Sequence, residues 1–376
     1  MKPAVYLDFN ATAPIRDEAV EAVMGAFRTG GNASSVHGFG RAARRLLEDG
    51  REQVAALVGV SGDDVIFTGG GTEANNLALL GCGCPNVIVS AVEHPSVLAV
   101  STGHAPVPVD GDGVIDLAAF EARLAEENGP AVVSVMLANN ETGVLQPVGR
   151  VSEIAKRYGA LVHCDAVQAA GKIAVDMRAL GVDMLSLAAH KIGGPQGIGA
   201  LILSTDLPLS PQIRGGGQER RRRAGTENIA GAAGFGAAAS AARAGLANFA
   251  KLSGMRDQLE EAVLSVAADA KVFGQKMARL PNTSCFAVPN LPSDTQVMAL
   301  DMEGVAVSSG SACSSGKVEA SHVLAAMGEH ELGISTIRVS LGWTSGSGDV
   351  DRFVEAWRKA YLRNRKQAGA PELVAS

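Results

Sequence analysis

Residues 64–80 read DVIFTGGGTEANNLALL. The apolar run at its start predicts a buried strand, the segment 72–80 predicts a helix, and three glycines join the two. Glycines let an anion approach the backbone, and the first turn of a helix offers free N–H groups. The stretch has neither the ending of a Walker A loop nor the spacing of a dinucleotide-binding loop. It indicates either a phosphate seat or an ordinary strand-to-helix turn capped by Thr72.

Buried strands continue to alternate with helices beyond this stretch. We expect strands at 86–92, 131–137, 161–163, 184–188 and 200–204, and helices at 151–158 and 228–250. This alternation indicates βαβ units and an α/β fold with a mostly parallel sheet. The small side chains of 228–250 are typical of a helix in close contact with another helix.

The pattern changes near residue 251, where a smaller α+β unit is expected. Its elements would be helices at 255–267 and 350–363 and strands at 284–288, 305–308 and 336–340. We therefore predict a large domain over 16–250 and a small domain made of 1–15 with 251–376.

The composition excludes several classes of protein. The 376 residues are 47% apolar and 19% charged, which fits neither a disordered chain nor a coiled coil. The 45 glycines follow no collagen repeat. With 33 basic and 39 acidic residues the net charge is −6, which disfavours general nucleic-acid binding. No signal peptide or membrane span is evident, and five cysteines are too few for a disulfide framework, so we expect a cytoplasmic protein.

Two polar motifs follow predicted strands. Lys191 comes directly after one buried strand and before two glycines, and Asp165 comes just after another. Ligands in α/β folds gather at the carboxyl ends of strands. Lys191 is either a surface lysine or a Schiff-base lysine for pyridoxal phosphate, and Asp165 is either a helix cap or the acid that protonates the pyridine nitrogen.

A second pair of candidates lies in the small domain. Cys313 sits in the Ser- and Gly-rich run 308–316, which has few apolar anchors. An exposed cysteine in such a loop suggests a nucleophile that must travel, whereas the other four cysteines have apolar settings and are read as structural. Arg338, within an apolar strand, requires a partner, either a substrate carboxylate or an internal acid.

Residues 214–226 combine three glycines, the run Arg220–Arg223 and Thr226. A run of four arginines is usually a solvated face, and the glycines with Thr226 provide a second candidate phosphate contact.

Taken together, the motifs resemble those of the cysteine desulfurases, pyridoxal-phosphate enzymes of fold type I in the class-V aminotransferase family. The resemblance extends from Tyr6 to Gly342 and includes the segments 31–37, 93–94, 139–143 and 223–226. The cysteine run followed by Ser321-His322-Val323-Leu324 is similar to the nitrogen-fixation and iron–sulfur-cluster group. The family resemblance implies a large domain that binds pyridoxal phosphate and contains a mostly parallel seven-stranded sheet. It also implies a homodimer with shared active sites.

The resemblance also implies roles for residues around the cofactor ring. Lys191 would hold pyridoxal phosphate as a Schiff base, and Asp165 would pair with the pyridine nitrogen. His94 would stack on the ring and move protons. Gln168 and Asn140 would contact the side that carries the phenolate oxygen.

Further implied roles concern the phosphate. Gly71, Thr72 and His190 would hold it, and Thr226 would reach it from the other subunit.

The substrate, L-cysteine, would be held by its carboxylate at Arg338 and Asn140. Cys313 would take its sulfur as a persulfide, leaving L-alanine, and pass the sulfur to an acceptor such as an iron–sulfur scaffold. No resident metal is implied, although Cys313 could serve as a transient iron–sulfur ligand. Neither nucleic acid nor membrane is an expected partner.

Two positions depart from the family pattern. Ala188 stands where the family has a serine that donates to the phosphate, and Ser186 or a water molecule could compensate. Residues 11–14 read Ala-Thr-Ala-Pro where paired threonines are usual. The alternative functions are a selenocysteine lyase or another β-eliminating lyase on the same scaffold, and a catalytically silent scaffold that binds assembly proteins.

Overall fold

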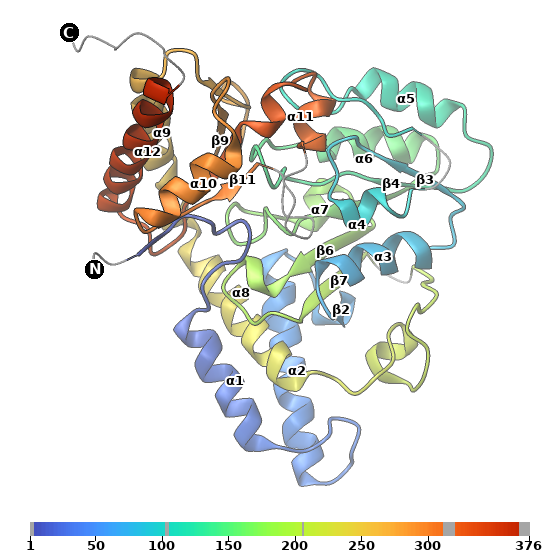
Figure 1. Cartoon of the computed structure of the whole chain (residues 1–376). Helices are drawn as coiled ribbons and strands as arrows, with labels where there is room; N and C mark the ends of the chain where they lie inside the picture. Colours follow the sequence, from blue (N-terminus) through green and yellow to red (C-terminus); the bar gives the residue numbers. More distant parts are fainter. Residues whose placement is uncertain (1–3, 102–104, 205–206, 311–319, 368–376) are drawn as a thin grey trace.

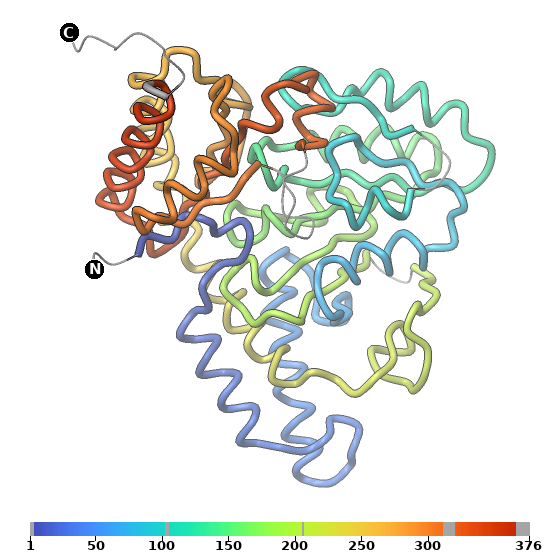
Figure 2. The backbone as a smooth tube through the Cα atoms, viewed as in Figure 1, coloured from blue at the N-terminus to red at the C-terminus, as the bar shows by residue number. Residues whose placement is uncertain are grey.

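The computed structural model describes residues 4–101, 105–204, 207–310 and 320–367. Its elements form a larger group around a central sheet and a smaller group beside it, which contains α9 (Leu252–Val266), α10 (Ser293–Met302) and α12 (Ser347–Gln367) (Figure 1, Figure 2). None of the described helices is both long and apolar enough to cross a membrane.

A mixed sheet of six strands forms the centre of the larger group. Its strands, in spatial order, are β2 (Val65–Thr68), β7 (Gly199–Leu203), β6 (Met184–Ala188), β5 (Leu161–Asp165), β4 (Ala131–Ser134) and β3 (Asn86–Val89). The four strands from β3 to β6 run parallel, whereas β7 is antiparallel to both β6 and β2. Nearly all their residues are buried, as expected where helices cover both faces of a sheet. The α/β class with a mostly parallel sheet is confirmed.

The described residues form six central strands rather than the expected seven. Beside β3, the segment 105–109 makes only isolated bridges, between Val107 and Ser90 and between Val109 and Ile115. The segment contains Pro106 and Pro108. Proline has no backbone N–H to donate to a neighbouring strand, so a segment with two prolines is a poor former of a regular strand.

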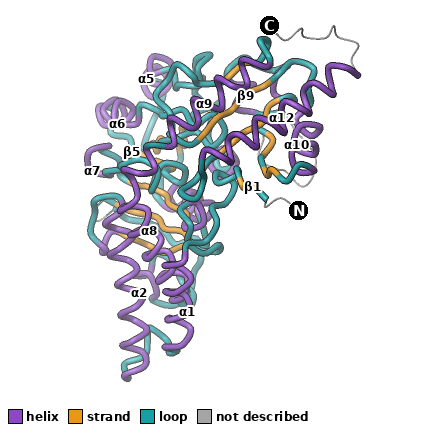
Figure 3. Tube along the Cα trace, turned by 90° about the vertical axis from the view of Figure 1, so that its left-hand side faces the viewer, coloured by secondary structure: helices purple, strands orange, loops and turns teal. Residues whose placement is uncertain are grey.

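Helices cover the sheet and extend beyond it. They are α1 (Asp17–Thr29), α2 (Gly38–Leu57), α3 (Gly71–Gly81), α4 (Pro95–Leu98), α5 (Leu117–Ala125), α6 (Val148–Arg157), α7 (Met177–Leu180) and α8 (Ile229–Ala250). The helices α1, α2 and α8 pack together and project from the molecule (Figure 3). A Cβ on Gly50 of α2 would lie 2.5 Å from the carbonyl oxygen of Ala232 in α8, so the expected close helix contact is confirmed and requires glycine.

The smaller group is built on an antiparallel sheet. Its strands, in order, are β11 (Ser308–Ser309), β12 (Thr336–Ser340), β9 (Thr283–Ala287) and β8 (Lys271–Val272); separately, β1 (Val5–Tyr6) pairs in parallel with β10 (Val305–Ala306). The short α11 (His322–Ala326) completes the group. Leu7 shares a buried apolar cluster with Phe286, Phe353 and Trp357, so the N-terminal segment packs with the C-terminal elements. The domain boundaries at residues 15 and 250 stay a prediction.

Candidate active site

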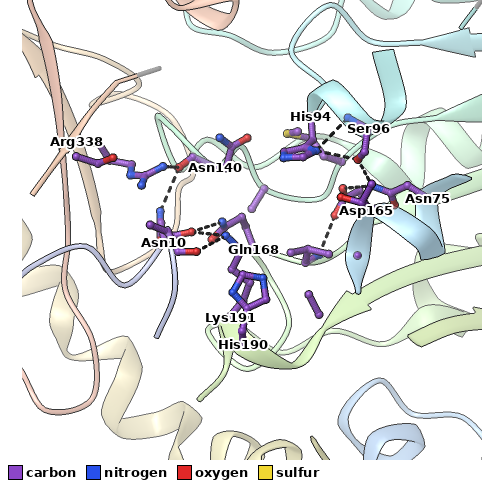
Figure 4. A pocket seen from close by; sticks show the side chains of 18 of the residues that line it. Asn10, Asn75, His94, Ser96, Asn140, Asp165, Gln168, His190, Lys191 and Arg338 are labelled. Carbon is purple, nitrogen blue, oxygen red and sulfur yellow. Dashed lines mark hydrogen bonds between the residues drawn. The ribbon is translucent and has the colours of Figure 1, made fainter. Parts of the chain in front are cut away.

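A cavity of about 370 Å³ lies where the carboxyl ends of the central strands meet the segment 8–11 and β12 (Figure 4). Nine of the residues singled out in the sequence line it: Gly71, Thr72, His94, Asn140, Asp165, Gln168, His190, Lys191 and Arg338. Thr226 is exposed and does not line this cavity, and Cys313 lies outside the described residues.

Lys191 ends a 3-10 turn, η2 (Ala189–Lys191), directly after β6. Its Nζ donates to the backbone oxygens of Asn10 at 2.7 Å and Ala11 at 2.8 Å. Burial, and then the nearby Arg338 guanidinium, lower the pKa of Lys191 to about 8. An amine with this pKa is partly uncharged near neutral pH and can act as a nucleophile or a base.

A chain of hydrogen bonds joins Asp165 to His94. Asn75 Nδ2 donates to Asp165 Oδ2 at 2.8 Å and to Ser96 Oγ at 2.9 Å, and Ser96 Oγ lies 2.8 Å from Nδ1 of His94. The backbone N–H of Ser96 also donates to Nδ1, so the proton of the neutral ring is on Nε2. Burial lowers the pKa of His94, which favours this neutral form.

The strand-to-helix turn after β2 has the open backbone that an anion seat requires, and the phosphate role stays a prediction. A Cβ on Gly71 would lie 2.9 Å from Cγ2 of Val167, so glycine is needed for the backbone to fit here. The N–H of Gly69 is already bound to Glu73 Oε2, at 2.6 Å. The first helical residues, Gly71 and Thr72, line the cavity, and their N–H groups have no acceptor within the helix, which leaves them for an anion.

Ala188 stands where the family pattern has a serine beside this turn, and Ser186 does not supply the missing hydroxyl. Ser186 is fully buried, and its Oγ lies 2.8 Å from Nε2 of His163. The expectation that Ser186 could compensate is therefore wrong, because its hydroxyl is held away from the cavity.

His190 Nδ1 lies 3.1 Å from Oγ1 of Thr12, and burial lowers the pKa of His190 to about 4.

Arg338 projects from β12 to the far wall of the cavity (Figure 4). Its guanidinium donates to Asp8 Oδ1 at 2.8 Å and to the backbone oxygen of Asn140 at 3.0 Å. Its Nε is buried without a partner among the described residues. The internal-acid alternative is thus present in the structure, and the substrate role of Arg338 stays a prediction.

The segment before Thr226 is anchored by a buried ion pair. Both ends of the Arg51 guanidinium donate to the Glu219 carboxylate, at 2.7 and 2.9 Å, and the two side chains are 6% and 4% exposed. Glu219, Arg220 and Arg221 have φ values of 42°, 55° and 66°. Three successive non-glycine residues in this region are strained, so the ion pair helps to hold a conformation that the backbone resists.

Two members of the arginine run are paired inside the chain. Arg220 bonds to Asp63, and Arg223 Nε donates to Oε1 of Glu73 at 2.9 Å. The second pair ties the segment before Thr226 to the first turn of α3, next to the anion seat.

The sequence did not point to several residues that shape this site. Asp8 and Asn10 line the cavity, Asn75 and Ser96 connect Asp165 with His94, and Lys172 is buried behind the cavity wall. A signal was available only for Lys172, since a lysine within the apolar stretch 166–173 has few ways to reach water.

No group of three or more His, Cys, Asp or Glu side chains that could hold a metal ion is found in the described part of the chain. The suggested transient iron–sulfur ligand, Cys313, lies outside that part.

Comparison with known proteins connects this geometry to a family. Residues 5–353 match the aminotransferase class-V family. A cysteine desulfurase of Cereibacter sphaeroides is 44% identical, covering 93% of this chain and 94% of that protein. An IscS-like cysteine desulfurase of Mycobacterium tuberculosis is 40% identical, covering 96% and 98%. A NifS-like protein of Rickettsia africae superposes with a TM-score of 0.88 at 35% identity, covering 95% of this chain and 99% of that one.

Proposed function

Since the chain belongs to the class-V aminotransferase family and, within it, to the cysteine desulfurases, we propose that it moves the sulfur of L-cysteine onto Cys313. L-cysteine and the Cys313 thiol would give L-alanine and a persulfide. The sulfur–sulfur bond forms as the carbon–sulfur bond breaks, its electron pair stays on the three-carbon fragment, and protons complete alanine. No external oxidant or reductant is needed.

The residues of the cavity fit pyridoxal phosphate. The observation that carries the proposal is an amine with a pKa of about 8 in a cavity that also contains a carboxylate and a glycine-lined helix N-terminus. Lys191 would hold the aldehyde, Asp165 the pyridine nitrogen, and the N–H groups of Gly71 and Thr72 with His190 the phosphate. When bound, the group supplies an electron-withdrawing ring that accepts the electron pair left on the substrate Cα.

Lys191 is the proposed base for the Cα proton. Its backbone acceptors at Asn10 and Ala11 fix where Nζ lies, and its lowered pKa leaves free amine near neutral pH. An ordinary lysine amine would be almost fully protonated under the same conditions and could not accept the proton.

Asp165 and His94 are proposed to act together on the ring. The bond from Asn75 orients the Asp165 carboxylate, and the Ser96 bonds orient the imidazole. A neutral His94 with its proton on Nε2 can stack on the ring without adding charge, and it can donate that proton to a group in the cavity.

Arg338 is the proposed site for the substrate carboxylate, together with Asn140. In the structure the guanidinium faces Asp8, so a substrate carboxylate would compete with or displace that partner. Two carboxylates and one guanidinium would favour a substrate that also carries an ammonium group, which is the form of an amino acid.

A homodimer with shared sites is part of the proposal. Thr226 does not line the cavity of its own chain, and the helices that project from the molecule carry exposed apolar side chains. Val20, Met24 and Phe27 follow helical spacing on α1, and Phe27 and Phe39 are 69% and 71% exposed. This face would pack against a second copy, and Thr226 would contact the partner's phosphate, as the resemblance implies. Delivery of the sulfur to an iron–sulfur scaffold, and a cytoplasmic location, stay predictions.

The proposal is tested by the visible absorbance of the purified protein with pyridoxal phosphate and by alanine release from L-cysteine. Wild-type protein should form the absorbance band of a lysine-bound cofactor, and Lys191→Ala should not. Lys156→Ala, on the exposed face of α6, is the matched control and should retain the band. A protein that stays colourless with added cofactor would contradict the proposal, and alanine release from selenocysteine alone would favour the lyase alternative.

A further inference from the structure

Lys172 is a buried lysine that the proposed reaction does not use. It is 3% exposed and lies behind the cavity residues Asn10 and Gln168 without lining the cavity itself. Its Nζ donates to Asn10 Oδ1 at 2.5 Å and to Gln168 Oε1 at 2.7 Å. Buried lysines usually have a carboxylate partner, and among the described residues this one bonds to neutral amide oxygens instead.

These contacts decide which way the carboxamide of Gln168 points. Its oxygen is bound to Lys172, and its Nε2 donates to the backbone oxygen of Asn10 at 2.9 Å. If the carboxamide were turned over, its oxygen would face the Asn10 carbonyl and its NH2 would face the Nζ donors. Both contacts therefore favour the same orientation, which leaves the second N–H of Nε2 for a partner in the cavity.

The orientation does not depend on the charge of Lys172. Burial, and then the nearby Lys191 and Arg338, lower the pKa of Lys172 well below its ordinary range. A neutral amine still has two N–H donors, and the structure provides two acceptors for them.

We propose that Lys172 is a positioning residue that holds the Gln168 carboxamide so that an N–H, and not the oxygen, faces the phenolate oxygen of the cofactor. The proposal rests on the proposed function, because that function supplies the phenolate. A donor at this position stabilises the charged oxygen, whereas a carbonyl oxygen there would repel it. Lys172 would thus act on the cofactor only through Gln168.

The first test follows the visible absorbance of the cofactor-loaded protein as a function of pH. Lys172→Met keeps an unbranched side chain of similar volume and removes the donors. The substitution should raise the pH midpoint of the absorbance change by about one to two units. This is the effect expected when the charged phenolate loses one hydrogen bond, here the bond from Gln168. Lys156→Met makes the same chemical change at an exposed position and should leave the midpoint unchanged.

A double substitution separates positioning from other effects. In the Gln168→Leu background, Lys172→Met should shift the midpoint no further, because its effect passes through Gln168. An additional full shift in that background would overturn the proposal, as would a Lys172→Met variant that is less stable but keeps the wild-type midpoint.

The second test uses cofactor-free protein labelled with [15N]glutamine. The Gln168 side-chain signal, identified by its absence in Gln168→Leu, should show two distinct and slowly exchanging protons in the wild type. It should shift or split in Lys172→Met and stay unchanged in Lys156→Met. A freely rotating, rapidly exchanging NH2 in the wild type would overturn the proposal even if Lys172→Met does not fold.

The two tests fail in different ways. If wild-type protein binds no cofactor, the proposed function is wrong, and the NMR measurement still decides whether Lys172 orients Gln168. If cofactor binds normally but the Gln168 side-chain signal is the same in Lys172→Met as in the wild type, only the positioning role is wrong.

Discussion

Replacing Ala188 with serine should strengthen the binding of pyridoxal phosphate. Ala188 is 4% exposed and lines the cavity, and its Cβ lies 3.5 Å from where a Cβ on Gly71 would be. A hydroxyl added here would therefore lie beside the anion seat. The hydroxyl of Ser186 is bound to His163 and cannot supply this contact. One hydrogen bond to a charged phosphate contributes about 1.5–3 kcal/mol, which corresponds to roughly 10- to 150-fold in the dissociation constant.

The assay is titration of cofactor-free protein with pyridoxal phosphate, followed by absorbance. Pyridoxal, which lacks the phosphate, is the control ligand, and its dissociation constant should not change in Ala188→Ser. Ala188→Val, which adds volume without a donor, should bind the phosphorylated cofactor no more tightly than wild type. An equal gain for both ligands, or no gain for pyridoxal phosphate, would refute the placement of the phosphate.

Two further predictions concern Lys191 and the buried ion pair. Capture of pyridoxal phosphate by cofactor-free protein should accelerate as pH rises, with a midpoint near pH 8, because only the free amine of Lys191 attacks. Stopped-flow absorbance measures this rate, and a midpoint near 10.5, the ordinary lysine pKa, would contradict the prediction. Glu219→Gln should reduce the free energy of unfolding in urea by about 3 kcal/mol, the lower end of the range for breaking a buried ion pair, because Arg51 keeps only its second carboxylate partner, Glu48. A loss under about 1 kcal/mol would show that water reaches Arg51 in the variant.

The main elements could be predicted because their burial is continuous. The runs 65–68 and 184–188 are apolar enough to identify central strands, and the glycines that follow the first run marked the turn into α3. The predicted strand 305–308 is instead two short strands, β10 and β11. The N-terminal β1 pairs with β10, while β12 pairs with β11, and such long-range pairing leaves no local pattern.

The site was predictable where strand ends carry reactive side chains, as at Asp165 and Lys191. The acceptors of Lys191 were not predictable, because they are backbone oxygens of Asn10 and Ala11, which every residue type carries. The apolar surroundings of Lys172 signalled its burial, but its contacts were not predictable, because they depend on a fold that brings the segment 8–11 against the loop after β5.

Ser186 illustrates why a correct strand can give a wrong role. Alternation along β6 places it on the same face as Ala188, so a compensating hydroxyl was a reasonable expectation. The neighbouring strand β5 decides the outcome, since His163 lies between Ser186 and Ser134 and bonds to both hydroxyls at 2.8 Å.

The most direct test of sulfur transfer to Cys313 measures alanine and protein-bound sulfur in the same sample after addition of L-cysteine. Wild-type protein without an acceptor should release one alanine for each persulfide, which mass spectrometry would locate on Cys313. Cys313→Ser should keep the visible band of the bound cofactor and yield neither product. Normal alanine release by Cys313→Ser would contradict the account.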